Sequence, residues 1–306
     1  MFATALLPVT LHESAGRLGA MLAFLRKFDT DRVVLLYVTT GVPGRTTEAA
    51  LGDLRERAIA AAREAIEVDE ESPAFRPRPF TPHSEADSPE SGIGVELLVK
   101  SGSPALEITR TAWEIGAGFI YFPYKRKSWI QQTLVGSTTK DVIRLTSLPV
   151  FVFRQRLASA PDDPLRIVYP TAFGDTDREA VPYLQYPGLA AEQLILLHVR
   201  ERAPDPAAER RRRETCDANL QRLSDEVAGN YAGVSSLQIV GNPRRAIPRV
   251  ARRENAGLLV VGKSDRSGGL SAVMGSVAGE LAKSAPCSVF IVSRAGAATA
   301  TGETAP

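Results

Sequence analysis

Cysteine and long apolar runs are what this sequence most clearly lacks. Only two cysteines occur in 306 residues, and Cys216 and Cys287 match no metal-binding or redox spacing. A disulfide framework and a cysteine-based metal site are therefore excluded, and the scarcity of cysteine fits a reducing compartment. No run of about 18 apolar residues occurs, so no transmembrane helix is expected. We therefore expect a cytoplasmic protein without membrane association.

An excess of charge of either sign is missing as well. The chain has 37 Lys and Arg residues against 35 Asp and Glu, a net charge of +2, which gives no overall electrostatic case for nucleic acid binding. The apolar start "MFATALLPVTLHES" has no basic segment and is interrupted by Pro8, so it predicts a first strand rather than a signal peptide. The length suffices for about two domains.

What the sequence does contain is an internal repeat. Shifted by 139 residues, the segment 95–123 falls on 234–262, and 135–153 falls on 274–292, without a gap. Identical pairs include Gly102/Gly241, Pro104/Pro243, Gly118/Gly257, Gly136/Gly275, Ser137/Ser276 and Phe151/Phe290. The two halves stay aligned at one constant offset over both segments, which a merely similar amino-acid composition would not produce. The repeat therefore indicates a duplication.

The repeat predicts two domains, residues 1–155 and residues 165–294. A polar, proline-containing linker is expected at 156–164, and residues 295–306 are expected to be a disordered tail. The segment 69–92 carries five prolines and has no counterpart in the second half, so it predicts an irregular surface loop.

Each half alternates short Val, Ile and Leu runs with helical stretches. In the second half the strands are expected near 166–171, 193–199, 235–240, 257–262 and 288–292. Such runs predict parallel sheets buried on both faces, so the fold class is α/β, with two tandem doubly wound five-stranded domains. A helix is expected over 207–229, and its "RRRR" at 210–213 is interpreted as a solvated face, with an acidic-partner patch as the alternative.

The ends of three predicted strands in the second half are candidates for a ligand site. Doubly wound sheets bind ligands at the carboxyl ends of strands, beside a topological switch point. These ends are Pro170-Thr171-Ala172, Val199 and Val261-Gly262, and Gly275-Ser276 opens the next helix with Ser276 as its N-cap. A helix start suits a phosphate, but the same glycines could serve only a tight turn.

Here the residues resemble the universal stress protein family, whose ATP-binding members show G-x2-G-x9-G-(S/T) after the fourth strand. Gly262 and Gly275-Ser276 match that motif at the right separation, while Asp265 replaces its second glycine. The segments "LLHV" (196–199), "GNP" (241–243) and "APCSVFIV" (285–292) add to the resemblance, which covers residues 1–155 and 165–294.

The resemblance implies an adenine-nucleotide α-hydrolase-like, Rossmann-like fold in each half. Family members pair through their last strands, so the segments 149–153 and 288–292 are expected to join the halves as an internal pseudo-dimer. An exposed apolar edge strand needs such a partner.

The resemblance also implies a nucleotide site in the second half, with ATP accompanied by Mg²⁺. The matching positions are Pro170, Thr171, Ala172, Val199, Val261, Gly262, Ser264, Asp265, Arg266, Gly275, Ser276 and Val277. Two departures stand out. The aspartate that the family carries after its first strand is Thr10 in one half and Ala172 in the other, and Asp265 would repel a triphosphate unless a metal or Lys263 compensates.

The first half departs further from the motif. Pro123 replaces the first glycine, which fixes φ and removes an N–H group. The remaining candidates for a degenerate site are Thr10, Lys125, Arg126, Gly136 and Ser137. The competing interpretation is a half that is retained for packing.

No other pattern in the sequence indicates catalysis or metal binding. No Ser/His/Asp or Cys/His arrangement can be assembled from local signatures, so we assign neither catalytic nor metal-binding residues. His198, which ends an apolar strand, is interpreted as a core or rim residue, and Trp113 and Trp129 are interpreted as packing residues.

The implied function is a stress-response or signalling module that binds an adenine nucleotide in its second half and is at most a slow ATPase. A protein partner is expected but not identified, and assembly into a further homodimer stays open. The rival interpretation is a protein-interaction module that has lost the ATP site, favoured by the missing aspartate, Asp265 and Pro123. A third, a slow ATPase or nucleotidyl transferase, has only the loop resemblance in its favour.

Overall fold

A computed structural model describes most of the chain. The described residues are 2–26, 28, 30–41, 45–70, 93–123, 137–154, 165–186, 189, 191–263 and 276–293. The predicted linker 156–164, the tail 295–306 and most of the proline-rich insertion lie outside these ranges. Across the described ranges, no helix is both long and apolar enough to cross a membrane.

The two halves contain the same alternation of strands and helices. The first half comprises β1 (Thr4–Pro8), α1 (Ala15–Arg26), β2 (Arg32–Thr39), α2 (Arg45–Glu70), β3 (Gly94–Ser101), α3 (Pro104–Glu114), β4 (Phe119–Pro123), α4 (Ser137–Leu145) and β5 (Val150–Phe153). The second comprises β6 (Arg166–Thr171), α5 (Asp175–Leu184), β7 (Ala191–Arg200), α6 (Pro206–Val227), the 3-10 turn η2 (Ala228–Asn230), β8 (Tyr231–Val240), α7 (Pro243–Arg253), β9 (Leu258–Lys263), α8 (Ser276–Ser284) and β10 (Ser288–Ser293). The five predicted strands and the predicted long helix of the second half are confirmed.

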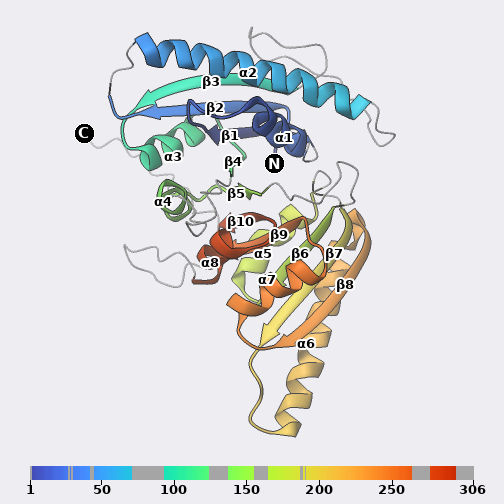
Figure 1. Cartoon of the computed structure of the whole chain (residues 1–306). Coiled ribbons are helices and arrows are strands. Elements are labelled where there is room, and N and C mark those ends of the chain that lie inside the picture. Colours follow the sequence, from blue (N-terminus) through green and yellow to red (C-terminus); the bar gives the residue numbers. More distant parts are fainter. Residues whose placement is uncertain are drawn as a thin grey trace, which may run out of the picture.

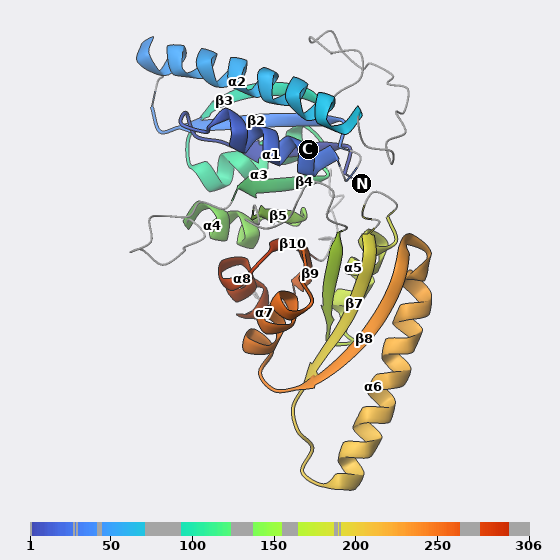
Figure 2. The same ribbon diagram turned by 45° about the vertical axis from the view of Figure 1, so that its right-hand side comes forward.

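All ten strands form one sheet, in the order β3-β2-β1-β4-β5-β10-β9-β6-β7-β8. Neighbouring strands are parallel within each half, whereas β5 and β10 pair antiparallel with Phe151 opposite Phe290. The prediction that the last strands join the halves is confirmed. Figure 1 and Figure 2 show this junction at the middle of the molecule, with one half on either side.

The helices form two layers, one on each face of the sheet. Helices α1, α2, α5 and α6 bury apolar side chains in one core, and α3, α4, α7 and α8 bury theirs in the other. Strand residues alternate between them, as Leu6 and Leu7 of β1 illustrate, because successive side chains point to opposite faces. Each core spans both halves, so the halves share their hydrophobic interior.

The duplication is visible in the backbone as well as in the sequence. Gly102 and Gly241, which correspond in the repeat, have φ values of 148° and 152° just before α3 and α7. The next pair, Gly116 and Asn255, have φ values of 63° and 59° after those helices end. Only glycine and a few polar residues adopt such angles readily, so the two halves repeat the same turns.

Aromatic side chains fill the junction on the α1–α5 face of the sheet. Phe2 lies 5.5 Å from Phe290 and 5.9 Å from Tyr183, measured between ring centroids, so the N-terminus of the first half packs into the second. Phe151 lies 5.8 Å from Phe290 across the paired strands. Large buried aromatic rings contribute strongly to packing, and here they stabilise the pairing of the halves.

Each half also caps a helix of the other with a basic side chain. Lys263 Nζ, buried at the end of β9, donates to the Ile143 carbonyl in the last turn of α4 at 3.0 Å. Arg154, which follows β5, donates to the carbonyls of Ala282 and Lys283 in the last turn of α8 at 2.7 Å. Ile143 and Ala282 correspond in the repeat, so equivalent helix ends receive equivalent caps.

We expect Lys263→Met to lower the free energy of unfolding by about 1–3 kcal/mol, because a buried carbonyl loses a charged donor. Urea unfolding followed by circular dichroism measures this loss. The control is Lys100→Met, which removes an exposed ion pair with Glu114 at 3.3 Å and should cost less than about 1 kcal/mol. Equal unfolding free energies for the two variants would contradict the role of Lys263.

Candidate functional site

The carboxyl ends of β9, β6 and β7 lie side by side and define the candidate site. The strand order within the second half places the topological switch point between β6 and β9. The described strands β6 and β9 pair only at Ile167 opposite Leu258 and at Val168 opposite Leu259. The hydrogen-bonded pairing of these two strands therefore stops before their carboxyl ends. The opening between them is where doubly wound folds bind ligands.

The structure brings together the predicted site residues that it describes at this edge. Pro170 and Thr171 end β6, exposed Ala172 follows them, Val199 lies near the end of β7, and Val261-Gly262 near the end of β9. Ser276 is the first residue of α8, one position inside the predicted cap, and Val277 packs against the second core. Ser264, Asp265, Arg266 and Gly275 lie outside the described residues.

Asp177, a carboxylate that the sequence analysis did not single out, organises the end of β6. It accepts hydrogen bonds from Tyr169 Oη at 2.6 Å and from Thr171 Oγ1 at 2.7 Å. Burial, followed by the Asp177 charge and hydrogen bond, raises the pKa of Tyr169 far above its usual value, so its hydroxyl stays a donor. Asp177 lies in the first turn of α5, where a negative charge is favourable.

Phe173 and His198 form an aromatic pair at the same edge. Their rings stack with centroids 4.5 Å apart and an interplanar angle of 26°. Phe173 has a φ of 55°, and its N–H donates to Thr171 Oγ1 at 2.9 Å, which holds the turn after β6. His198 Nδ1 lies 2.9 Å from the Thr171 carbonyl oxygen, so the imidazole is fixed at the rim, as predicted.

A cavity of about 410 Å³ lies beside this pair, between the end of β7 and α6. Its lining comprises Phe173, His198, Arg200, Glu201, Arg211, Arg212, Thr215, Cys216 and Asn219. The predicted solvated arginines of α6 are indeed exposed, but two of them also face this space. Aromatic rings and guanidinium groups converge here, a combination that spacing along the chain did not reveal because α6 meets β7 only in the fold.

Arg200 is held at the cavity wall by a carboxylate of α6. Its Nη2 lies 2.6 Å from Glu209 Oε1, and its Nε donates to Gln238 Oε1 at 3.2 Å. The Nη1 atom is buried without a hydrogen-bond partner in the described part of the chain. The Arg200 hydrogen bond, aided by the Ala203 N–H group, lowers the pKa of Glu209 to about 2.

Gly262 is required by packing within the chain itself. A Cβ placed there would lie 2.6 Å from Cβ of Thr176, in the first turn of α5. Without a side chain at Gly262, α5 can approach the end of β9. The tight-packing interpretation of this glycine therefore has a direct structural basis.

Lys263, which the sequence analysis named as one possible compensation for the charge of Asp265, lies on a strand. It is the last residue of β9, 4% exposed, and its ammonium group is directed to α4 of the first half. The apolar pattern of the sequence predicted that this strand ends at residue 262, one residue before β9 ends in the structure. Lys263 thus donates to a backbone carbonyl at the junction of the halves, while Asp265 lies outside the described residues.

At the corresponding edge of the first half, residues that follow β1 are bonded to one another and to α2. Thr10 Oγ1 donates to Glu13 Oε1 at 3.1 Å, and buried Glu13 lies 3.6 Å from Arg17. Arg57 of α2 donates to the carbonyls of Leu11 and Glu13. Ser137 is the exposed first residue of α4, while Lys125, Arg126 and Gly136 lie outside the described residues. These contacts favour the interpretation that this half is retained for packing.

Chemical reactivity at the cavity is limited. Burial, followed by the nearby Asp217 charge, raises the pKa of the Cys216 thiol to about 11, so it is protonated at neutral pH and a weak nucleophile. Thr215 Oγ1 donates to the Arg211 carbonyl at 2.9 Å. The described lining therefore supports binding and orientation of a ligand more than covalent chemistry.

Sequence comparison matches two tandem stretches of this chain, residues 1–154 and 165–293, to the profile described as "Universal stress protein family". The chain belongs to the universal stress protein family. A comparison with curated protein sequences finds no significant match.

Solved structures show the same fold over nearly the whole chain. A universal stress protein from Archaeoglobus fulgidus DSM 4304 is 19% identical with a TM-score of 0.62, and the match covers 97% of this chain and 100% of that one. A functionally unknown protein from Pseudomonas aeruginosa PAO1 is 16% identical with a TM-score of 0.63, covering 96% and 93%. At these identities the likeness supports the tandem family fold and no more.

We expect Gly262→Ala to destabilise this family member by about 1–3 kcal/mol, because the new methyl group overlaps Thr176. In a Thr176→Gly background the same substitution should cost much less. Thermal and urea unfolding measure both costs. Gly52→Ala is the control, since the space around it is open and alanine favours its helix by up to about 1 kcal/mol. An unchanged cost in the Thr176→Gly background would contradict the packing role.

A second prediction concerns acid stability. Because the folded-state pKa of Glu209, about 2, lies below its ordinary value near 4.5, its stabilising effect is present above pH 4.5 and lost as pH falls through 2. Glu209→Gln should therefore be less stable than wild type at pH 7, with the difference shrinking between about pH 4.5 and 2. Glu192→Gln, which breaks an exposed pair with Arg166 at 3.7 Å, is the control for thermal melts across this range.

Proposed function

We propose that this chain is a stress-response or signalling protein that binds an adenine nucleotide, ATP in the first instance, at the carboxyl edge of its second half. The observation that carries this proposal is the cavity of about 410 Å³ beside the Phe173–His198 stack. Its volume lies in the range of small-molecule sites. A planar aromatic pair suits the adenine ring.

The position of the cavity relative to α8 supports a nucleotide rather than adenine alone. The cavity adjoins β6 and β7, and β9, which leads towards α8, lies on the other side of β6. A nucleotide lying across β6 would direct its phosphates to the start of α8, where Ser276 begins the helix. Unpaired N–H groups and the helix dipole favour anions at such a start.

Slow or absent turnover follows from the same lining. Cys216 is protonated at neutral pH, and His198 is held between Phe173 and the Thr171 carbonyl. In the described ranges no group of three or more His, Cys, Asp or Glu side chains could hold a metal. Mg²⁺ would therefore enter with the phosphates of ATP.

An interaction module that has lost nucleotide binding is the alternative, and two observations favour it. Ala172 leaves no carboxylate at the position where ATP-binding members carry aspartate, and Gly262 is explained by Thr176 alone. The two proposals differ in whether the edge of the second half accepts ATP.

Calorimetric titration with ATP and Mg²⁺ tests the proposal. Wild-type protein should bind with measurable heat, and His198→Ala should weaken binding by about tenfold or more through lost stacking. Gly275→Val should abolish binding by blocking the helix start. Ala172→Asp, which restores the family carboxylate, should tighten binding by about tenfold.

The matched control is Thr10→Asp, the same restoration in the first half, where Thr10 is bonded to Glu13 and Arg57 to the Leu11 carbonyl. It should leave ATP affinity unchanged. Absence of heat for both wild type and Ala172→Asp would overturn the nucleotide proposal in favour of the interaction module. Phosphate release that persists after stringent purification and disappears in Gly275→Val would instead indicate an ATPase.

A further inference from the structure

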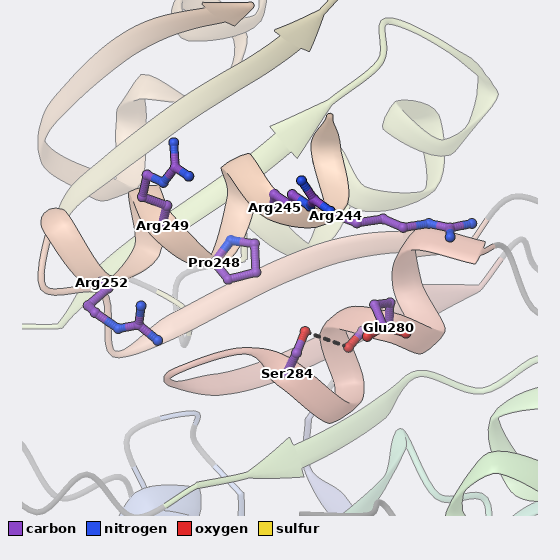
Figure 3. A pocket seen from close by; sticks show the side chains of 7 residues that line it. All are labelled: Arg244, Arg245, Pro248, Arg249, Arg252, Glu280 and Ser284. Atoms are coloured by element: carbon purple, nitrogen blue, oxygen red, sulfur yellow. Dashed lines mark hydrogen bonds between the residues drawn. The ribbon is translucent and has the colours of Figure 1, made fainter. Parts of the chain in front are cut away.

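A second concave surface lies on the other layer of helices, between α7 and α8. It encloses about 600 Å³ and is lined by Arg244, Arg245, Pro248, Arg249 and Arg252 of α7 and by Glu280 and Ser284 of α8. Figure 3 shows the arginine side chains spread along α7 with Glu280 and Ser284 on the facing helix. We call this surface the arginine groove.

The sequence of α7 separates an apolar stripe from the arginines. Ala246, Ile247, Val250 and Ala251 are buried against the sheet, whereas the four groove arginines are exposed. Helical periodicity places residues three and four apart on one face, which gives this division. The segment "PRRAIPRVARR" carries that signal, although sequence analysis did not single it out.

These four positive charges are not balanced within the described part of the protein. No carboxylate there forms an ion pair with their guanidinium groups, whereas neighbouring Arg253 pairs with Glu254 at 2.7 Å. Arg244 and Arg245 also lie in the first turn of α7, which contains no acidic residue. Positive charge at a helix N-terminus opposes the helix dipole, so this arrangement costs stability.

The duplicated half shows that the fold does not require these arginines. In the repeat, Arg244, Arg245 and Arg252 correspond to Ala105, Leu106 and Trp113 of α3. Helix α3 packs in the same layer and the same core as α7.

The fourth groove arginine, Arg249, corresponds to Arg110 of α3, and the two residues differ in their ion pairs. Arg110 of α3 is paired with Glu107 and Glu114 of its own helix, at 2.7 Å and 3.3 Å. The second half therefore carries unpaired charge at positions where the first half has apolar or neutralised side chains. Unpaired charge that the fold does not require indicates a ligand for the arginines.

The chain as a whole gives no electrostatic case for a nucleic acid at this groove, because its net charge is only +2. Helices α3 and α4 expose Leu106, Trp113 and Leu145, at 58%, 57% and 45% of their surface, so the expectation that Trp113 is a packing residue is wrong. Aromatic and arginine side chains are enriched at protein interfaces. The ligand that fits four clustered guanidinium groups on such a chain is a protein segment that carries carboxylates.

We propose that the arginine groove docks an acidic segment of a partner protein. Guanidinium groups bind carboxylates through paired hydrogen bonds, which fits a segment rich in Asp and Glu lying between α7 and α8. This surface is separate from the nucleotide cavity, which lies under α6 on the other face of the sheet.

Fluorescence anisotropy with a fluorescein-labelled oligoglutamate of about ten residues tests the proposal on the full chain. The double variant Arg245→Glu/Arg249→Glu should weaken binding by about tenfold or more at low salt, because attraction becomes repulsion. The matched control is Arg210→Glu/Arg213→Glu on α6, which changes the net charge equally and should weaken binding less than about threefold. Added salt should reduce binding by the wild-type protein.

Two further measurements keep the outcome clear. The groove variant should keep its melting temperature, because both arginines are exposed and neither forms an ion pair among the described residues. A labelled oligothymidylate of similar length and anionic phospholipid vesicles are the competing probes. The proposal would be overturned if both double variants lost affinity equally or if oligoglutamate did not bind. Tighter binding of oligothymidylate or vesicles through the same arginines would also overturn it.

Discussion

The antiparallel pairing of β5 with β10 is the interaction on which the rest of the structure depends. Each half ends in an apolar strand that would otherwise be an exposed edge, and such edges invite aggregation. Placing Phe151 opposite Phe290 joins two five-stranded sheets into one and makes both hydrophobic cores continuous. Arg154 and Lys263 then tie each half to a helix end of the other, so the junction combines apolar packing with charged hydrogen bonds.

Because the halves share their cores, each copy could change at its edges and outer faces without losing the fold. At the carboxyl edge of the first half Glu13 pairs with Arg17, and Arg57 bonds the Leu11 carbonyl, whereas the second half has a cavity beside Phe173 and His198. The outer faces of the two halves differ as well: α3 exposes apolar side chains, whereas α7 exposes arginines. The two copies therefore differ at equivalent positions while they share one sheet.

The two proposed binding surfaces of the second half meet at one helix. Helix α8 begins at Ser276, where the phosphates of a nucleotide would lie, and carries Glu280 and Ser284 of the arginine groove. Its last carbonyls accept hydrogen bonds from Arg154 of the first half. The two proposed surfaces and the junction therefore all involve one helix of nine residues.

The sequence by itself determined the duplication, the α/β alternation, the strand positions and the family, because these depend on periodicity and on spacing along the chain. It also located Thr171, Val199 and Gly262 at one edge, since parallel strands end together. It could not find Asp177 beside Tyr169 or the pairing of Arg200 with Glu209, nor that Lys263 is buried at the junction. These features depend on how a helix lies over a strand and on which carbonyl a side chain reaches. Only the tertiary structure decided them, because such contacts join residues whose proximity no local pattern encodes.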